Sequence, residues 1–157
     1  MDPQPVVHDT FVLERSYPAA PDRVFGYFAD AAKKRRWFGE NDSHVVEDFD
    51  LDFRVGGAER TSYRLKPGTP FPGVVLANDG VIQEIAPGRR VVTATTMSMG
   101  DRRISSALIT VELVADGAGT KLIFTHQAAF YEGADGPEMR KGGWVQLFDK
   151  LARVVAD

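Results

Sequence analysis

The residues of this 157-residue chain whose types and spacing could do chemistry are Glu59, Tyr63 and His126. Glu59 and Tyr63 have the same parity in one segment of alternating polarity, and His126 has the parity of the apolar residues in another. Because alternate residues of a strand point to the same face, the pattern predicts that all three face one hollow beside a sheet. A carboxyl group and an imidazole held together there could act as general acid and general base.

A structural interpretation of the same residues is more common. Ion pairs perturb pKa values without any catalysis, so Glu59 and His126 can instead satisfy each other or the backbone, or lie in water at the rim of the sheet. Thr61 shares the inward parity, and Glu47 joins it only if no bulge interrupts the alternation over residues 45–55. Catalysis is therefore left open, and we favour a binding role over an enzymatic one.

Spacing and composition argue against other kinds of site. The three histidines, His8, His44 and His126, lack the spacing typical of metal ligands, and the chain has no cysteine. No Gly-x-Ser-x-Gly motif is present, and the two Gly-Gly pairs do not match a phosphate-binding loop. We therefore expect no metal site, no cofactor and no nucleophilic serine.

The charge balance argues against nucleic acid as a partner. There are 19 Lys and Arg against 22 Asp and Glu, a net charge of -3, whereas a nucleic-acid binder needs a basic surface. The basic run at residues 33–36 is interpreted as the solvated face of a short helix. No apolar run is long enough to span a bilayer and no secretion signal is visible, so the sequence predicts a cytoplasmic protein that binds no membrane.

The spacing of apolar residues predicts one strand, two short helices, six more strands and one long helix. Residues 1–9 contain two prolines and are interpreted as a loose lead-in, and residues 10–157 as a single domain. Three helices are predicted: the first starts at Pro21, the second covers residues 31–38, and the third runs from Pro137 to Val155. The predicted strands cover residues 11–17, 43–55, 58–65, 81–86, 90–99, 104–114 and 120–127, with a turn at residues 78–80.

Short glycine-bearing links between successive strands predict an antiparallel meander, and the order of elements predicts an α+β fold. A curved antiparallel sheet of about seven strands would bury its concave face against the long terminal helix. Curvature would leave a hollow between the sheet and that helix. Apolar hollows with a few polar groups are where small molecules bind.

Short motifs spread along the chain carry a family resemblance, and FDLDFRVGG at residues 49–57 is the most distinctive. The others are residues 11–17, 20–25, Trp37, 85–92, 110–113, 119–126 and Gly143-Trp144 with Leu147 and Leu151. On these motifs the chain resembles the START-like superfamily, also known as SRPBCC or Bet v 1-type, whose members have the helix-grip fold. Within it, the chain is similar to small bacterial proteins of the Hsp90 ATPase activator homologue 1-like family.

The chain departs from the pattern of that family in two segments. Glu59 stands two residues after a Gly-Gly pair, where the family often has Tyr or Phe. Thr95 and Met97 lie in a strand where the family often has an aromatic residue, commonly Trp. The resemblance therefore implies a pocket that is more polar or roomier than usual. Because the superfamily hosts binders, aromatase/cyclases and hydroxylase domains, it implies the fold more firmly than the function.

The function that these observations favour is binding of a small, largely hydrophobic or aromatic ligand, such as a lipid or polyketide, between the sheet and the terminal helix. One rival hypothesis is a cyclase/aromatase-type enzyme with Glu59 and His126 as its acid–base pair. Another is a stress-response partner protein linked to a chaperone. The chain is expected to be a monomer or a homodimer. The residues predicted to line the ligand site are Trp37, Glu47, Phe49, Leu51, Glu59, Thr61, Tyr63, Met97, Phe124, His126, Trp144, Leu147 and Phe148.

Overall fold

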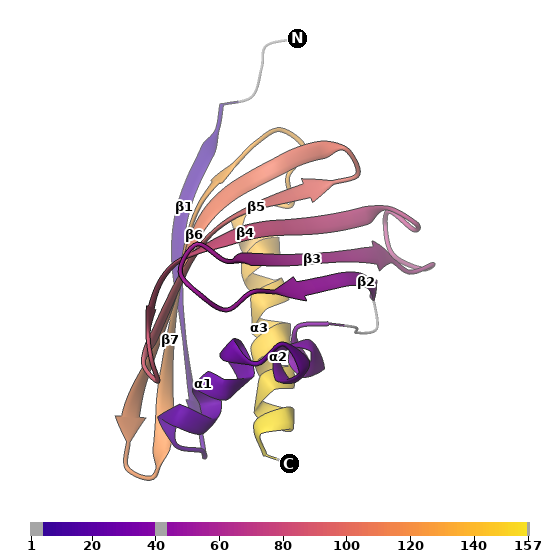
Figure 1. The fold of residues 1–157 in the computed structure, drawn as a ribbon. Coiled ribbons are helices and arrows are strands. Elements are labelled where there is room, and N and C mark those ends of the chain that lie inside the picture. The colour runs from indigo at the N-terminus through magenta and orange to yellow at the C-terminus, as the bar shows by residue number, and fades with distance from the viewer. Residues whose placement is uncertain (1–4, 40–43, 157) are drawn as a thin grey trace.

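The computed structural model describes residues 5–39 and 44–156, which form one seven-stranded sheet and three helices (Figure 1). The elements are β1 (Val7–Tyr17), α1 (Pro21–Ala29), α2 (Ala31–Trp37), β2 (His44–Leu51), β3 (Ala58–Leu65), β4 (Val75–Ala86), β5 (Arg90–Met99), β6 (Arg102–Asp116), β7 (Gly119–Phe130) and α3 (Pro137–Val155). All neighbouring strands are antiparallel, in the order β1-β7-β6-β5-β4-β3-β2. The predicted α+β helix-grip fold and its meander from β2 to β7 are confirmed.

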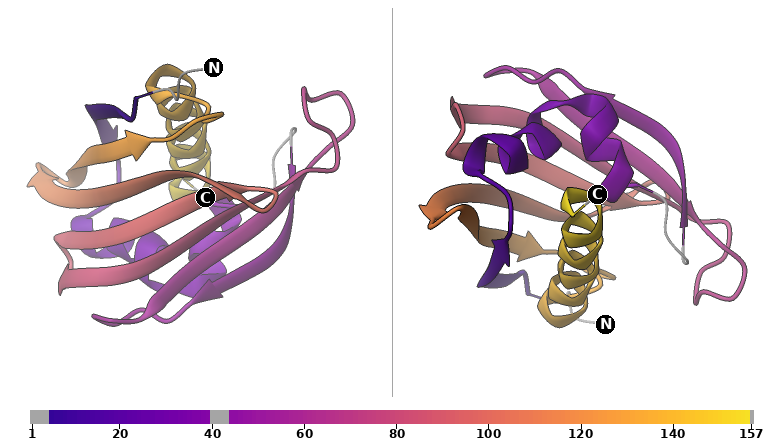
Figure 2. Two further views of the ribbon diagram at one scale, coloured as in Figure 1. Left: turned by 90° about the horizontal axis from the view of Figure 1, so that it is seen from above. Right: turned by 90° about the horizontal axis from the view of Figure 1, so that it is seen from below.

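The sheet curls around the helices, which all lie on its concave side (Figure 2). α1 and α2 form a short helical pair, and α3 packs against β1 and α2. Among the described residues, none of the helices combines the length and the apolar composition that a membrane span requires.

The hydrophobic core lies between β1, β7, β6 and the inner sides of the helices. Alternation along β7 turns Leu122 and Phe124 inward, and both are fully buried. Phe148 and Leu151 lie three residues apart on the inner face of α3 and belong to the same buried cluster as Leu122 and Phe124. The ring centroids of Phe148 and Phe124 lie 4.9 Å apart. Each such side chain contributes about 2 kcal/mol through burial of apolar surface. β7 and α3 therefore hold the centre of the molecule together.

β1 begins at Val7, so residues 7–9 are not part of a loose lead-in as the sequence predicted. Val7 pairs with Phe130 of β7, and Asp9 pairs with Ala128. The strand is extended by pairing with a partner that is distant in sequence, and local composition cannot reveal such pairing.

β4 runs straight through the Asn-Asp-Gly segment where the sequence predicted a turn. Asn78 lies opposite Thr61 of β3, and Gly80 lies opposite Glu59. A Cβ atom on Gly80 would lie 3.2 Å from the backbone oxygen of Glu59 and 3.1 Å from a methyl carbon of Thr93. Glycine at this position therefore permits close packing within the sheet rather than a turn.

β2 contains a bulge between Val46 and Asp48, and it ends at Leu51. The extra residue reverses the inward parity, so Val46 is buried and Glu47 is exposed. Glu47 forms an ion pair with Arg64 of β3 in solvent. The prediction that Glu47 faces the hollow is therefore wrong.

Candidate functional site

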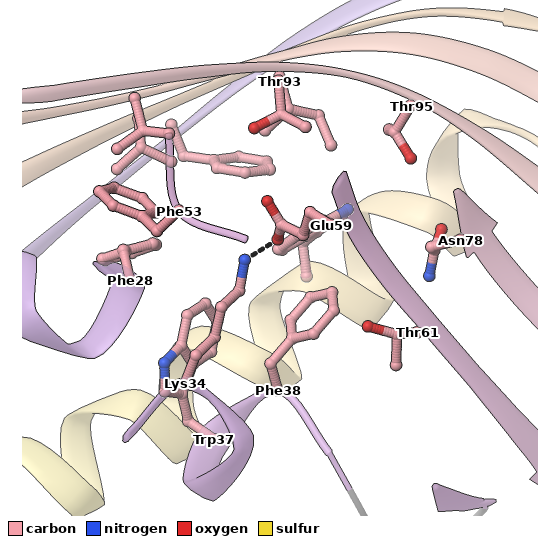
Figure 3. Close-up of a pocket in the computed structure, with 15 residues that line it drawn as sticks. Phe28, Lys34, Trp37, Phe38, Phe53, Glu59, Thr61, Asn78, Thr93 and Thr95 are labelled. Atoms are coloured by element: carbon pink, nitrogen blue, oxygen red, sulfur yellow. Dashed lines mark ion pairs between the residues drawn. The ribbon is translucent and has the colours of Figure 1, made fainter. Parts of the chain in front are cut away.

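A recess lies between the concave face of the sheet and the two short helices (Figure 3). One wall carries polar side chains from three neighbouring strands and from α2: Glu59, Thr61, Asn78, Thr93, Thr95 and Lys34. The remaining walls are apolar and largely aromatic: Phe28, Trp37, Phe38, Phe53, Val91, Ile109, Val111, Phe124 and Trp144. We call these fifteen residues the recess.

The recess is small. Its cavity volume is about 50 Å³, which is room for a few water molecules. Pockets for drug-sized ligands measure about 300–1,000 Å³. Glu59 and Thr95 do make it polar, as the resemblance implied, but they do not make it roomy because the rings of Phe38 and Trp144 also line it.

Inside the recess, Lys34 forms an ion pair with Glu59 (dashed line in Figure 3). Asp30 caps the N-terminus of α2, and its side chain accepts a hydrogen bond of 3.0 Å from the backbone N–H of Lys33. The three-residue spacing of Lys34 and Trp37 turns both to the inner face of the helix, and both are buried. The prediction of a solvated basic run holds for its other three residues and is wrong for Lys34.

The ion pair lies in a weakly hydrated environment. Lys34 is 7% exposed, and burial of its ammonium group lowers the pKa of Lys34 to about 7. The carboxylate of Glu59, in direct contact, is the group that stabilises the charged amine. The pair as a whole is electrically neutral whichever of the two groups holds the proton.

Two aromatic rings, those of Phe38 and Trp144, lie where the recess meets solvent. Both residues are partly exposed, and their ring centroids are 5.6 Å apart. The Nζ atom of Lys34 lies 4.9 Å from the centroid of the Phe38 ring. Phe38 follows α2 directly and Trp144 belongs to α3, so rotation of either side chain would widen the recess without moving the sheet.

Trp37 forms the buried floor of the recess and is 1% exposed. Its indole Nε1–H donates a hydrogen bond of 2.8 Å to the backbone oxygen of Tyr27. Its ring lies 5.1 Å from that of Phe28 and 6.0 Å from that of Phe148. Trp37 therefore belongs to the core and to the recess wall at the same time.

His126 lies on the concave face but does not line the recess. Three strands separate β7 from β3, which carries Glu59, and the Glu59 carboxylate contacts Lys34. The imidazole stacks on the ring of Phe11 with centroids 4.6 Å apart. The structure therefore does not bring Glu59 and His126 together as an acid–base pair.

The surroundings of His126 are those of a neutral, buried imidazole. Its Nδ1 atom has no hydrogen-bond partner within the part of the chain that the structure describes. Burial, together with the nearby Arg140 guanidinium, lowers the pKa of His126 to about 4. Arg140 donates two hydrogen bonds of 2.8 Å to Asp135 and one of 3.0 Å to the Ser105 hydroxyl. This cluster could not be predicted from local sequence, because it joins the start of α3 to β6.

The other predicted site residues surround the recess or lie apart from it. Tyr63 hydrogen-bonds with Asn78, and its ring centroid lies 4.2 Å from that of His44. Phe148 belongs to the hydrophobic core and Leu147 packs against it, so the space under α3 is filled. Partly buried but outside the recess are Phe49, Leu51 and Met97. Of the thirteen predicted residues, the recess contains Trp37, Glu59, Thr61, Phe124 and Trp144.

Several recess residues were missed. Phe28, Phe38, Phe53 and Lys34 come from the helices and the loop after β2, whose positions over the sheet depend on tertiary packing. The one local feature of the sequence that indicates the inward position of Lys34 is its three-residue spacing from Trp37. Within residues 5–39 and 44–156, no three His, Asp or Glu side chains lie close enough together to hold a metal ion.

Residues 18–156 match the family model described as Activator of Hsp90 ATPase homolog 1-like protein. A solved structure from Rhizobium loti is 39% identical, with 96% of this chain and 99% of that chain covered and a TM-score of 0.83. One from Rhizobium leguminosarum is 33% identical, with 97% of each chain covered and a TM-score of 0.89. The AHSA1 protein from Silicibacter pomeroyi is 24% identical, with 94% and 98% covered and a TM-score of 0.73. No curated protein matches the chain.

Proposed function

We propose that this chain, which belongs to the family of Activator of Hsp90 ATPase homolog 1-like proteins, binds a small ligand in the recess. The ligand has an aromatic or apolar body and an uncharged polar end that forms hydrogen bonds. The observation that carries this proposal is the division of the recess into an aromatic wall and a polar wall, with a neutral ion pair within it.

The charges of the recess favour a neutral ligand. Lys34 and Glu59 already compensate each other, so a charged ligand would add an unpaired ion at a cost of roughly several kcal/mol. A hydroxyl or carbonyl group can instead hydrogen-bond with the ion pair or with the Thr61 hydroxyl. Six aromatic side chains offer faces and edges to the body of the ligand. Benzyl alcohol is a simple compound with these features.

Ligand entry requires the recess to widen, because its present volume does not hold an aromatic ring. Phe38 and Trp144 are the natural moving parts, since both are partly exposed and come from separate elements. Side-chain rotation with little backbone movement is common at binding sites. We expect these two rings to rotate when a ligand binds.

Tryptophan fluorescence provides a direct test. The chain has two tryptophans, Trp37 and Trp144, and both line the recess. Titration with benzyl alcohol is expected to change the emission saturably. The substitution Thr95→Phe places a large side chain on the polar wall, where it would occupy the recess, and is expected to weaken binding at least ten-fold.

A matched control is Thr96→Phe on the same strand, since alternate strand residues point to opposite faces. It should bind like the wild type, with a melting temperature measured for both variants to show that they fold. Equal affinities in the wild type and Thr95→Phe would overturn the proposal. So would the lack of a saturable change with benzyl alcohol and a series of neutral alicyclic and aromatic alcohols.

A further inference from the structure

A primary amine in an aromatic recess offers chemistry that simple binding does not need. Resting on the proposed function, we propose that Lys34 captures small aldehydes or ketones with an aromatic or apolar body as a reversible imine, with Glu59 carrying the proton. Three features of the recess support this step: the direct contact of the two groups, the charge balance of the pair, and the aromatic surroundings of the buried amine.

The first feature is the contact between amine and carboxylate. The Lys34 ammonium gives its proton to the Glu59 carboxylate, and the free amine attacks the carbonyl carbon to form a carbon–nitrogen bond. The nitrogen of this adduct passes one of its protons to the oxygen and Glu59 supplies the second, so that the oxygen leaves as water while the carbon–nitrogen double bond forms. One aldehyde and one lysine amine thus give one imine and one water, with no oxidant or reductant needed.

The second feature is the charge balance before and after the step. The protonated imine carries the same single positive charge as the ammonium, and it remains beside the Glu59 carboxylate. The recess therefore gains no unpaired charge when the covalent bond forms. Burying an unpaired ion is the large cost that would otherwise oppose such a reaction.

The third feature is the aromatic environment of the buried amine. Burial lowers the pKa of Lys34 to about 7, so its ammonium group gives up a proton more readily than that of an exposed lysine. An exposed lysine, with an ordinary pKa of about 10.4, is almost fully protonated near neutral pH. The aromatic walls exclude bulk water, which would hydrolyse the imine.

Reductive trapping on the wild-type chain tests the inference. The protein is incubated at pH 7 with benzaldehyde and sodium cyanoborohydride, which reduces protonated imines to stable secondary amines. Chymotryptic digestion and tandem mass spectrometry then compare Lys34 with the adjacent Lys33, which is exposed. We expect Lys34 to be labelled at least ten-fold faster in the folded protein, and the two rates to become equal in urea. Labelling of folded Lys34 no faster than Lys33 would overturn the inference.

A variant tests the role of Glu59. Glu59→Gln retains a hydrogen-bonding side chain of the same size but cannot carry the proton, so Lys34 labelling should slow at least ten-fold while Lys33 labelling stays constant. Circular dichroism shows whether the variant is folded, and an unchanged or faster Lys34 rate in the folded variant would overturn this role. If this variant does not fold, Glu59→Asp replaces it, because a shortened carboxylate should slow the labelling and the same unchanged rate would contradict the role.

Benzyl alcohol, which has no carbonyl group, separates this inference from the proposed function. If it changes the tryptophan emission saturably while benzaldehyde does not label Lys34 preferentially, ligand binding stands and imine formation is overturned. If benzyl alcohol does not change the tryptophan emission saturably and benzaldehyde does not label Lys34 preferentially, both proposals fail. Preferential labelling of Lys34 together with saturable benzyl alcohol binding supports both.

Discussion

Lys34, which is buried, and Glu59, which is partly buried, form an ion pair whose two members depend on each other. Removing one partner leaves the other desolvated, so Lys34→Met should lower the free energy of unfolding by about 3 kcal/mol. Replacing both, with Lys34→Met and Glu59→Leu together, should recover most of this loss, because apolar residues suit the aromatic surroundings. Urea unfolding at pH 7 measures both variants.

The control for this prediction is the exposed pair of Glu47 and Arg64 on the outer side of the sheet. Arg64→Met should leave the urea midpoint nearly unchanged, since solvent already screens that pair. An equal loss in Lys34→Met and Arg64→Met would show that the Lys34 pair is not buried.

His126 predicts a pH dependence of stability. Its pKa is lowered to about 4 in the folded protein, whereas an unfolded histidine has a pKa of about 6.5. Between these values the unfolded chain binds the proton more tightly than the folded protein does. The contribution of His126 to the free energy of unfolding is therefore complete above about pH 6.5 and decreases as the pH drops toward 4. The loss from pH 7 to pH 5 should be about 2 kcal/mol from this group.

Urea unfolding at the two pH values measures this loss. The variant His126→Phe retains an aromatic ring for Phe11 to stack on but removes the titrating group. Its stability should fall less over the same pH range. The same slope in the variant and the wild type would rule out His126 as the source.

The orientations of individual side chains show which parts of the site could be predicted from the sequence. Parity predicted that Glu59 and Thr61 face inward, and it did so correctly because β3 has no bulge. The same reasoning failed for Glu47, since one extra residue in β2 reverses the pattern. Lys34 could not be assigned to the site from charge alone, because only the docking of α2 places its amine against Glu59.

At the level of elements, α3 contains an unexplained pair of helical glycines. Gly142 and Gly143 lie inside the helix, and a Cβ atom on either would have no atom within 4 Å. No neighbouring atom lies close enough to require a glycine at either position, and the helix already begins at Pro137, before the pair. Gly142→Ala and Gly143→Ala should each therefore stabilise the protein by about 0.5–1 kcal/mol, through helix propensity and a less flexible unfolded chain.

Thermal unfolding of these variants checks the prediction. Gly57→Ala is the control, because its Cβ atom would collide with the backbone oxygen of Asp52 and should destabilise the protein. A lower melting temperature in Gly142→Ala would mean that the helix is not continuous through this position.

Elements with strong local signals were predicted well. The bounds of α3 follow from a proline in the first turn and from apolar residues at helical spacing, and β3 and β5 follow from the turns that flank them. β1 and β4 were misjudged at Val7 and at Asn78, where pairing with neighbouring strands overrides the local preference for a loop or turn. Ladder pairing is a tertiary interaction, so no window of sequence contains it.

At the scale of the whole molecule, the sequence predicted a hollow between the sheet and the terminal helix. In the structure, Phe148 and Leu151 of α3 fill that space by packing on β7. The recess lies mainly under the short helices, where Trp37 and Phe38 leave a small volume against the polar wall of β3, β4 and β5. Topology follows from the order of elements, whereas the volume of a hollow depends on every side chain that enters it.

The proposed ligand is expected to bind in the recess rather than elsewhere on the molecule. A second, open groove of about 430 Å³ runs along β1, β7 and β6, lined by residues that include His8, Leu108 and Ala129, and offers a competing location. Two-dimensional ¹H–¹⁵N NMR of the chain titrated with benzyl alcohol separates the two locations. The two indole signals, assigned with Trp144→Phe, report the recess, and the backbone signals of His8 and Ala129 report the groove. We predict saturable shifts of both indole signals with little change at the groove, whereas shifts at the groove with unmoved indoles would contradict this account.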